Sequence, residues 1–267
     1  MAASENRYER LISAIFRKRF RAGQAAVAFS RDDIVEAAKR LNIVLPKNLG
    51  DVLYSFRYRA SLPKAILRRA PAGKEWIIRP AGRAQYRFVL TPVGAANITP
   101  SKLLAETKVP DATPGVIAAY ALTDEQALLA RLRYNRLIDI FTGLTCYSLQ
   151  SHLRTTVQGM GQVETDEIYV GIDKRGVHYI IPVQAKGGKD KMGVVQIEQD
   201  FAVCKTKFPN LVCLPIAAQF MAQGVIALFS FEEGTDGVKV TGEKHYRLVA
   251  PGELSPDELR LYQSRQD

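Results

Sequence analysis

The spacing of apolar positions predicts three helices in the first sixty residues. Residues 6–20 carry one helical stripe of apolar side chains that ends in a run of basic residues. A second helix begins at Ser30, a residue suited to an N-cap, and closes at Asn42. A third stripe follows in residues 47–59, with Tyr and Arg side chains on or beside its other face.

Two short strands follow these helices. Residues 76–78 and 86–90 are rich in aromatic and β-branched residues and enclose a turn at Gly82. Three helices and a hairpin are the order of a winged helix-turn-helix, whose third helix enters the major groove of DNA. The DNA contacts expected from the third helix are Lys47, Asn48, Tyr54, Ser55, Arg57, Tyr58 and Arg59. Those expected from the hairpin are Lys74, Arg79, Arg83 and Arg87.

The middle of the chain is less regular. Residues 91–120 hold four of the thirteen prolines and predict a linker with a short helical piece. A long helix is expected from Thr123 to Gly143, since Thr suits an N-cap and Gly a helix end. Residues 143–160 are polar and predict no regular element. Their candidate DNA contacts are Gln150, His152 and Arg154.

From residue 163 the pattern predicts a sheet interrupted by a helix. Strands are expected at 163–173, 177–188, 211–217 and 225–231, a helix at 190–207, and a terminal hairpin at 238–248.

The composition is that of a globular chain whose core needs no disulfide or metal. Of its 267 residues, 47% are hydrophobic and 24% are charged. Cys146, Cys204 and Cys213 lack CxxC spacing, and three histidines are too few to suggest structural zinc. With no apolar leader and no run of about 18 apolar residues, we expect a cytoplasmic protein with no membrane association.

Positive charge is confined to the start of the chain. The formal net charge is +10. Residues 1–90 contain 19 Lys or Arg and 7 Asp or Glu, a net charge of +12, and the remainder carries −2. This asymmetry indicates a polyanion-binding domain joined to a domain with another task. A basic surface that binds nothing and a contact to RNA are the alternatives.

The predicted hairpin of residues 163–186 carries the clearest chemistry. Its first strand opens with three carboxylates, and its second strand ends in Gln-Ala-Lys. These residues are Glu164, Asp166, Glu167, Gln184 and Lys186. Because the turn lies at the other end of both strands, the acidic start of one strand should meet the end of the other, with Gln184 and Lys186 on one face.

This combination suits phosphodiester hydrolysis. Carboxylate oxygens bind Mg²⁺, which polarises a phosphate and lowers the pKa of a bound water. A nearby lysine can orient or help deprotonate that water and offset developing charge. Lys186 is the candidate for this role, and Lys189 and Lys191 are expected to line the DNA cleft beside it.

An acid followed across a hairpin by (D/E)-x-K is the signature of the PD-(D/E)XK nucleases. Residues 120–235 resemble this superfamily, in the style of type II restriction endonucleases. The resemblance implies a mixed sheet flanked by helices, Mg²⁺ as cofactor and double-stranded DNA as substrate. It maps Lys186 onto the motif lysine and Asp166 onto the first metal-binding acid, with Gln184 as a further ligand.

Gln184 departs from the motif, which usually has an acid two positions before the lysine. An amide oxygen still binds a hard cation, but without charge. Either Glu164 or Glu167 compensates, or the site has lost activity; Glu167 could also replace Asp166 if the turn contains a bulge. Three acids at one strand start favour compensation, because they repel one another unless a cation neutralises them.

We therefore expect an α/β (α+β) protein with an N-terminal winged helix-turn-helix domain and a C-terminal PD-(D/E)XK-type mixed sheet flanked by helices. The expected domains are residues 1–95 and 121–267, with a linker at 96–120. The expected function is Mg²⁺-dependent, sequence-specific cleavage of double-stranded DNA. Analogy with restriction enzymes adds a homodimer and a DNA methyltransferase encoded nearby.

Three other functions stay open. A transcription regulator whose nuclease-like domain only binds DNA would account for Gln184. A repair or recombination nuclease would recognise DNA structure and not sequence. An RNA-processing enzyme would prefer RNA when both nucleic acids compete.

Overall fold

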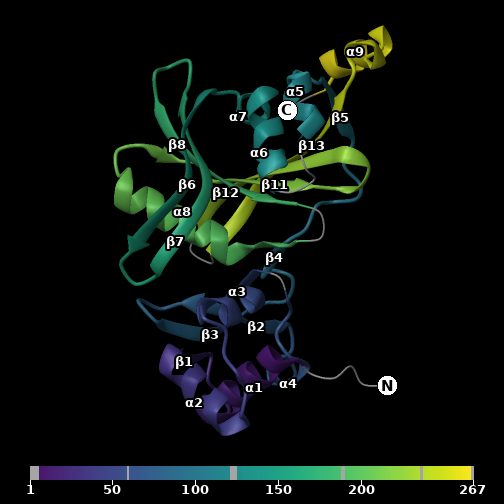
Figure 1. The fold of residues 1–267 in the computed structure, drawn as a ribbon. Coiled ribbons are helices and arrows are strands. Elements are labelled where there is room, and N and C mark those ends of the chain that lie inside the picture. The colour runs from purple at the N-terminus through teal and green to yellow at the C-terminus, as the bar shows by residue number, and fades with distance from the viewer. Residues whose placement is uncertain (1–5, 59, 121–124, 188–189, 235–236, 266–267) are drawn as a thin grey trace. The chain divides into compact units, whose positions relative to one another are not determined.

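The computed structural model describes residues 6–58, 60–120, 125–187, 190–234 and 237–265, which form a mixed α/β protein (Figure 1). They fall into two compact units. The first contains the chain up to Ile98 with Arg154–Val163 and Gly193–Gln199, and the second contains Thr99–Leu153, Glu164–Met192 and the chain from Asp200. None of the helices in these described stretches is both long and apolar enough to cross a bilayer.

The first unit contains a three-stranded sheet covered by helices. Its elements are α1 (Arg7–Arg19), β1 (Ala26–Ser30), α2 (Arg31–Leu41), α3 (Gly50–Tyr58), α4 (Lys64–Leu67), β2 (Lys74–Pro80), β3 (Gln85–Pro92) and β4 (Asn97–Ile98). The antiparallel sheet has the order β1-β3-β2, and its core forms around Phe16, Trp76 and Phe88. The three predicted helices and the two strands are confirmed, and β1 is an additional strand.

Side-chain caps explain where α1 and α2 begin. Asn6 and Glu9 form a capping box at the start of α1. Ser30 and Asp33 form another at the start of α2, and Asn42 ends that helix in a left-handed conformation with φ of 51°. The predicted start at Ser30 and the predicted end at Asn42 are therefore confirmed.

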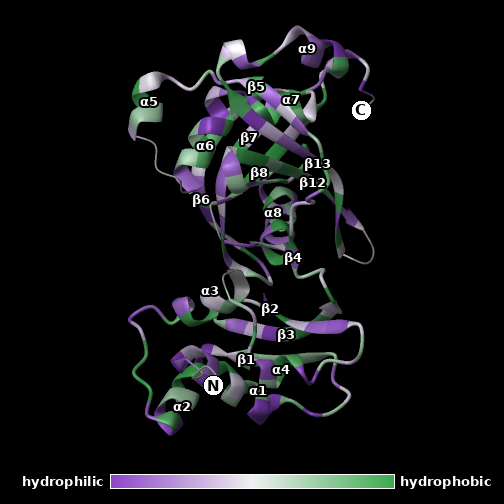
Figure 2. Ribbon diagram, turned by 90° about the vertical axis from the view of Figure 1, so that its right-hand side faces the viewer, coloured by the Kyte–Doolittle hydropathy of each residue, from purple (hydrophilic) through white to green (hydrophobic). Residues whose placement is uncertain are grey.

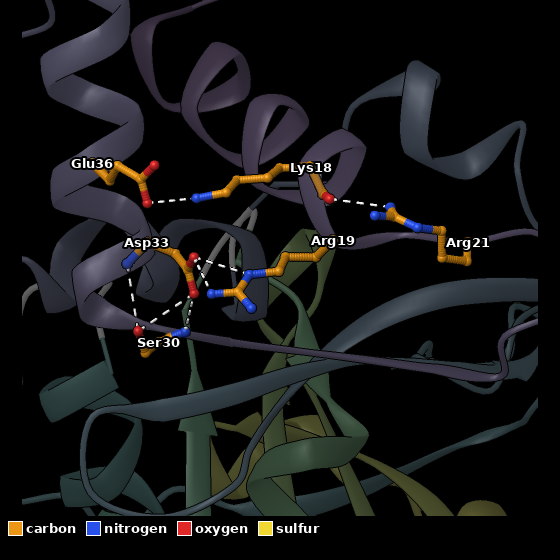
Figure 3. Close-up of polar contacts among 6 residues, drawn as sticks. All are labelled: Lys18, Arg19, Arg21, Ser30, Asp33 and Glu36. Carbon is orange, nitrogen blue, oxygen red and sulfur yellow. Dashed lines mark hydrogen bonds and ion pairs between the residues drawn. The ribbon is translucent and has the colours of Figure 1, made fainter.

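Two basic side chains at the end of α1 are paired with carboxylates of α2 (Figure 3). Arg19 donates to Asp33 from Nη2 at 2.7 Å and from Nε at 3.0 Å. Lys18 pairs with Glu36 at 2.5 Å, and Arg21 donates to the backbone carbonyl of Lys18. Part of the positive charge of the first unit is thus used in ion pairs between two of its own helices.

The rest of the chain adds a large mixed sheet with helices. Its elements are β5 (Glu106–Pro110), α5 (Gly115–Tyr120), α6 (Glu125–Tyr134), α7 (Leu137–Thr142), β6 (Thr145–Val157), β7 (Gly161–Ile172), β8 (His178–Lys186), β9 (Met192–Gly193), α8 (Val194–Lys207), β10 (Val212–Cys213), β11 (Ile216–Phe220), β12 (Val225–Gly234), β13 (Gly237–Val249) and α9 (Pro256–Gln263), with 3₁₀ turns at Ala222–Gly224 and Pro251–Glu253. The strand order among the described residues is β5-β13-β12-β11-β8-β7-β6, with β10 also beside β8. Strand β8 has antiparallel β7 on one side and parallel β11 on the other.

Helices cover both faces of this sheet at β7 and β8. Leu132 of α6 belongs to the same core cluster as Tyr169 and Ile181. Cys204 of α8 packs instead with Ile168, which points to the opposite face because side chains alternate along a strand. Figure 2 shows hydrophobic residues along the central strands, as burial on both faces requires.

Three predicted elements differ from the structure. The linker predicted for residues 96–120 contains β5, which pairs in parallel with β13. Residues 143–160, predicted to be irregular, include the whole of β6. The hairpin predicted at 238–248 is the single strand β13, and Gly242 lies opposite Ser230, where an added Cβ would come within 2.8 Å of the serine Oγ.

The long helix predicted from Thr123 to Gly143 is broken into α6 and α7. Thr123 lies outside the described residues, and the predicted end at Gly143 is confirmed. The break falls at Arg136, which has a left-handed φ of 50°. Beside it, Asn135 accepts a hydrogen bond from the backbone N of Ala112 at 2.7 Å, so a tertiary contact stabilises the interruption.

Candidate active site

The predicted acid, amide and lysine come together where the pairing of β7 with β8 ends. The two strands pair in antiparallel register as far as Glu167. One residue earlier, Oδ2 of Asp166 accepts a hydrogen bond from the backbone N of Ala185 at 2.8 Å. The Asp166 carboxylate therefore lies against the backbone between Gln184 and Lys186.

Strand β7 is irregular at Asp166. Thr165 donates from Oγ1 to Asp200 of α8 at 2.6 Å, whereas Glu167 accepts from Arg133 of α6. Residues two apart in a regular strand share a face, but these two contact helices on opposite faces. The alternation thus breaks at Asp166, which is why its carboxylate can turn toward the backbone of β8.

Glu167 belongs to an internal ion pair. It is 0% exposed and accepts hydrogen bonds at Oε1 from Arg133 Nη2 at 2.7 Å and from Ser148 Oγ at 2.6 Å. These partners lie on α6 and β6. Glu167 was one of the candidate metal ligands, but it is hydrogen-bonded to Arg133 and Ser148, and the charges that act on Asp166 are those of Lys186, Glu125 and Glu164.

Gln184 is held by its side-chain nitrogen. Nε2 donates to Oδ1 of Asp200 at 3.0 Å and to the backbone carbonyl of Glu164 at 3.2 Å. Gln184 is 1% exposed and Asp200 is 0% exposed. The amide therefore joins the end of β8 to the start of β7 and to α8.

Burial raises the pKa of Asp200 to about 8. Hydrogen bonds from Thr165 and Gln184 act in the opposite direction, and the nearby charge of Asp166 raises the pKa further. A carboxyl group in this environment is largely protonated, and therefore neutral, at neutral pH.

The raised pKa of Asp200 predicts a stability that falls as the pH rises. Between the unfolded value of 3.8 and about 8, the folded chain holds a proton that the unfolded chain has lost. Raising the pH therefore lowers the free energy of unfolding, by at most about 1.4 kcal/mol per pH unit. In metal-free urea denaturation, the loss between pH 6 and pH 8 should be roughly 2 kcal/mol larger for the wild type than for Asp200→Asn. Equal losses in the two proteins would contradict the assignment.

Lys186 is buried beside an acid of α6. Its Nζ lies 2.7 Å from Oε1 of Glu125, and the residue is only 4% exposed. The pKa of Asp166 is raised, first by burial and then by the charges of Glu125 and Glu164, while the Ala185 hydrogen bond and Lys186 lower it. Asp166, Glu125, Glu164 and Lys186 therefore form one electrostatic cluster in which carboxylates outnumber the ammonium group.

The oxygen donors of this cluster are of the type that binds a hard cation, but they are few. No group of three or more His, Cys, Asp or Glu in the described part of the chain is arranged to hold a metal. Magnesium, however, is commonly bound through one or two carboxylates together with waters and substrate phosphates. Asp166 and Glu125 are partly exposed and Glu164 is exposed; Glu125 is paired with Lys186, which leaves Asp166 and Glu164 as the candidate donors.

The candidate DNA-binding residues differ in their exposure. Lys47, Asn48, Tyr54, Lys74, Arg83, Arg87, Gln150, His152, Arg154 and Lys191 are exposed, and Ser55 and Arg79 are partly buried. Arg59 and Lys189 lie outside the described residues, as do the side chains of Arg57 and Tyr58.

Internal partners are seen for Asn48, Arg79 and His152, among others. Asn48 accepts from the backbone N of Gly50 at 3.0 Å, at the start of α3. Arg79 is paired with Glu198 through two hydrogen bonds within the first unit. His152 lies 3.8 Å from Glu164 and therefore borders the cluster around Asp166.

The structure adds Glu125, Thr165 and Asp200 to the residues expected from sequence. Glu125 lies on a helix well before the hairpin in sequence, and Asp200 lies on α8, the helix that follows the hairpin. Their acidic side chains resemble ordinary polar helix positions until the tertiary structure is known. Thr165 stands among the three acids of β7, and only the irregularity at Asp166 turns it toward α8.

The fold and the site define a mixed α/β protein in which an acid, an amide and a lysine meet where β8 ends beside the middle of β7. Comparison with family models, curated proteins and solved structures gives no match. Any function must therefore be argued from the site itself.

Proposed function

We propose that the chain is a Mg²⁺-dependent endonuclease that cuts double-stranded DNA at specific sequences, with a second unit of the PD-(D/E)XK type. One observation carries the proposal: the Asp166 carboxylate is hydrogen-bonded to the backbone between Gln184 and Lys186. This is the juxtaposition that an acid and an x-K pair need for phosphodiester hydrolysis.

Each residue of the cluster has a role in this proposal. Asp166, Glu164 and the amide oxygen of Gln184 would hold Mg²⁺. When bound, the ion supplies charge that polarises the phosphate and acidifies a water. Lys186 orients that water and stabilises negative charge, and its pairing with Glu125 keeps the ammonium group in place.

The first unit would supply DNA recognition. Its order of α1, β1, α2, α3, β2 and β3, and its β1-β3-β2 sheet, support a winged helix-turn-helix. Lys47 and Tyr54, near and on α3, are exposed and could reach base edges or phosphates. A restriction role would add a cytoplasmic location, a homodimer and a methyltransferase encoded nearby.

A DNA-binding regulator is the second candidate. It is favoured by the burial of Gln184 and Lys186, which are 1% and 4% exposed, and by the small number of accessible acids. In that function the cluster would only stabilise the ends of β7 and β8.

Digestion of unmethylated plasmid and phage DNA tests the proposal. The wild type with Mg²⁺ should give discrete fragments, and EDTA should abolish them. Asp166→Ala should reduce the cleavage rate by about 10²-fold or more, because it removes the central carboxylate. Asp257→Ala is the matched control, since this acid of α9 is highly exposed and pairs only with Arg260 in the described contacts.

The outcomes separate the candidate functions. Tight DNA binding without cleavage by either protein would replace the nuclease with the regulator. Cleavage restricted to branched or damaged DNA would indicate a repair or recombination nuclease, and preferential cleavage of RNA would indicate RNA processing.

A further inference from the structure

A buried carboxyl group stands directly behind Gln184. Oδ1 of Asp200 accepts hydrogen bonds from Gln184 Nε2 at 3.0 Å and from Thr165 Oγ1 at 2.6 Å. Within the described residues, Oδ2 has no hydrogen-bond partner. A buried and only half-satisfied carboxyl group destabilises a fold, so packing alone does not account for it.

The two bonds made by Nε2 fix the orientation of the Gln184 amide. A glutamine amide has two N–H donors, and here one points to Asp200 and the other to the backbone carbonyl of Glu164. Rotating the amide by 180° would place its oxygen against both of these acceptors. The amide oxygen is therefore held on the side away from Asp200.

The same contacts explain why position 184 is not acidic. A glutamate at this position would have no N–H to donate to the Glu164 carbonyl, and it could bond to Asp200 only through the proton that the Asp200 carboxyl group carries. Glutamine supplies a donor to both the carbonyl and the carboxyl group. The residue types at 184 and 200 are thus chemically interdependent.

We propose that Asp200 is a positioning residue that holds the Gln184 amide with its oxygen directed into the cluster around Asp166. The inference rests on the proposed nuclease function, in which that oxygen is a ligand. Asp200 itself is 0% exposed, so in this proposal it acts through Gln184 and makes no direct contact with solvent-borne ligands.

Four variants test the interdependence. Asp200→Ala removes the acceptor, and Asp200→Asn keeps a carbonyl oxygen where Oδ1 stands. Gln184→Glu places two carboxyl groups in contact. In the double variant Gln184→Glu/Asp200→Asn, the new amide can donate to the new carboxylate while its oxygen still accepts from Thr165. Cys204→Ala, one turn further along α8 and packed in the adjacent core, is the matched control for destabilisation of this helix.

The first readout does not require activity. Hydrogen exchange of the Gln184 side-chain amide, followed by NMR, should be slow in the wild type and in Asp200→Asn. It should be at least about 10-fold faster in Asp200→Ala, because one N–H loses its buried acceptor. Equally slow exchange in Asp200→Ala would overturn the inference, whether or not the protein cuts DNA.

The second readout is the Mg²⁺ concentration that gives half-maximal cleavage. Loss of a group that orients a ligand typically weakens metal affinity by about 10–100-fold, so Asp200→Ala should raise this concentration by that factor. Asp200→Asn should stay within about 3-fold of the wild type. Gln184→Glu should be impaired by about 10-fold, and the added Asp200→Asn should restore it. Cys204→Ala should lower the denaturation midpoint without changing the Mg²⁺ requirement.

The two proposals fail differently. A wild type that cleaves no DNA and binds no Mn²⁺ overturns the proposed function. An active wild type whose Mg²⁺ requirement is unchanged in Asp200→Ala overturns only the role of Asp200. If Asp200→Ala does not fold, Gln184→Glu is compared with the double variant instead. The role of Asp200 is overturned if the double variant fails to restore the Mg²⁺ requirement of the wild type.

Discussion

Lys186→Ala should reduce DNA cleavage by about 10³-fold, because the only ammonium group assigned to the cluster is lost. The Nζ atom lies 2.7 Å from Oε1 of Glu125, and the residue is only 4% exposed, so the substitution removes a positive charge from a position that bulk solvent hardly reaches. DNA affinity should change only a few-fold, since the recognition surface is assigned to the first unit. Single-turnover cleavage with saturating Mg²⁺, together with a DNA-binding titration, measures both effects.

Lys174→Ala is the matched control for this result. Lys174 lies in the turn of the same hairpin, at the end opposite to Lys186, and is exposed. Its removal should leave the cleavage rate unchanged within about 2-fold, as is usual for exposed surface positions. If Lys186→Ala cleaves as fast as the wild type, Lys186 has no catalytic role and the proposed assignment of the hairpin is wrong.

Arg133→Met should lower the free energy of unfolding by about 3 kcal/mol, because it leaves the buried Glu167 without a compensating charge. Glu167 is 0% exposed, whereas the arginine reaches it from a partly exposed position on α6. Adding Glu167→Gln should recover most of this loss, since a neutral amide no longer needs the guanidinium group. Urea denaturation at neutral pH measures all three proteins.

An exposed ion pair provides the comparison for this prediction. Arg260 lies 2.7 Å from Asp257, with both side chains largely exposed. Arg260→Ala should cost less than about 1 kcal/mol, as for other surface pairs. A comparably small loss in Arg133→Met would show that Glu167 is not a structural anion, and it would return this residue to the set of candidate metal ligands.

Local signals predicted much of the first unit correctly. Ser30 and Asn42 are residues whose side chains or backbone preferences act within a few positions, and α2 begins and ends at them. The stripes of α1 and α3 likewise depend on spacing within one element. Strand β1 was not predicted, because its five residues, Ala26–Ser30, form a strand only by pairing with β3.

The elements that were predicted wrongly depend on contacts between distant parts of the chain. Strand β6 is exposed along most of its length and is largely polar, so its pairing with β7 is visible only in the sheet. Strand β5 looks like part of a proline-rich linker until β13 is placed beside it. The break at Arg136 depends on a contact of Asn135 with Ala112, more than twenty positions away.

The candidate site was likewise predicted in part from the sequence and completed only by the tertiary structure. The sequence determined that Asp166, Gln184 and Lys186 would meet, because a hairpin with a short turn must bring its two open ends together. Only the tertiary structure decided the rest: Glu167 turns to Arg133, Thr165 and Gln184 turn to Asp200, and Lys186 reaches Glu125. The physical reason is that residue spacing fixes which strand ends meet, whereas burial and hydrogen bonding to helices from elsewhere in the chain fix where each side chain points.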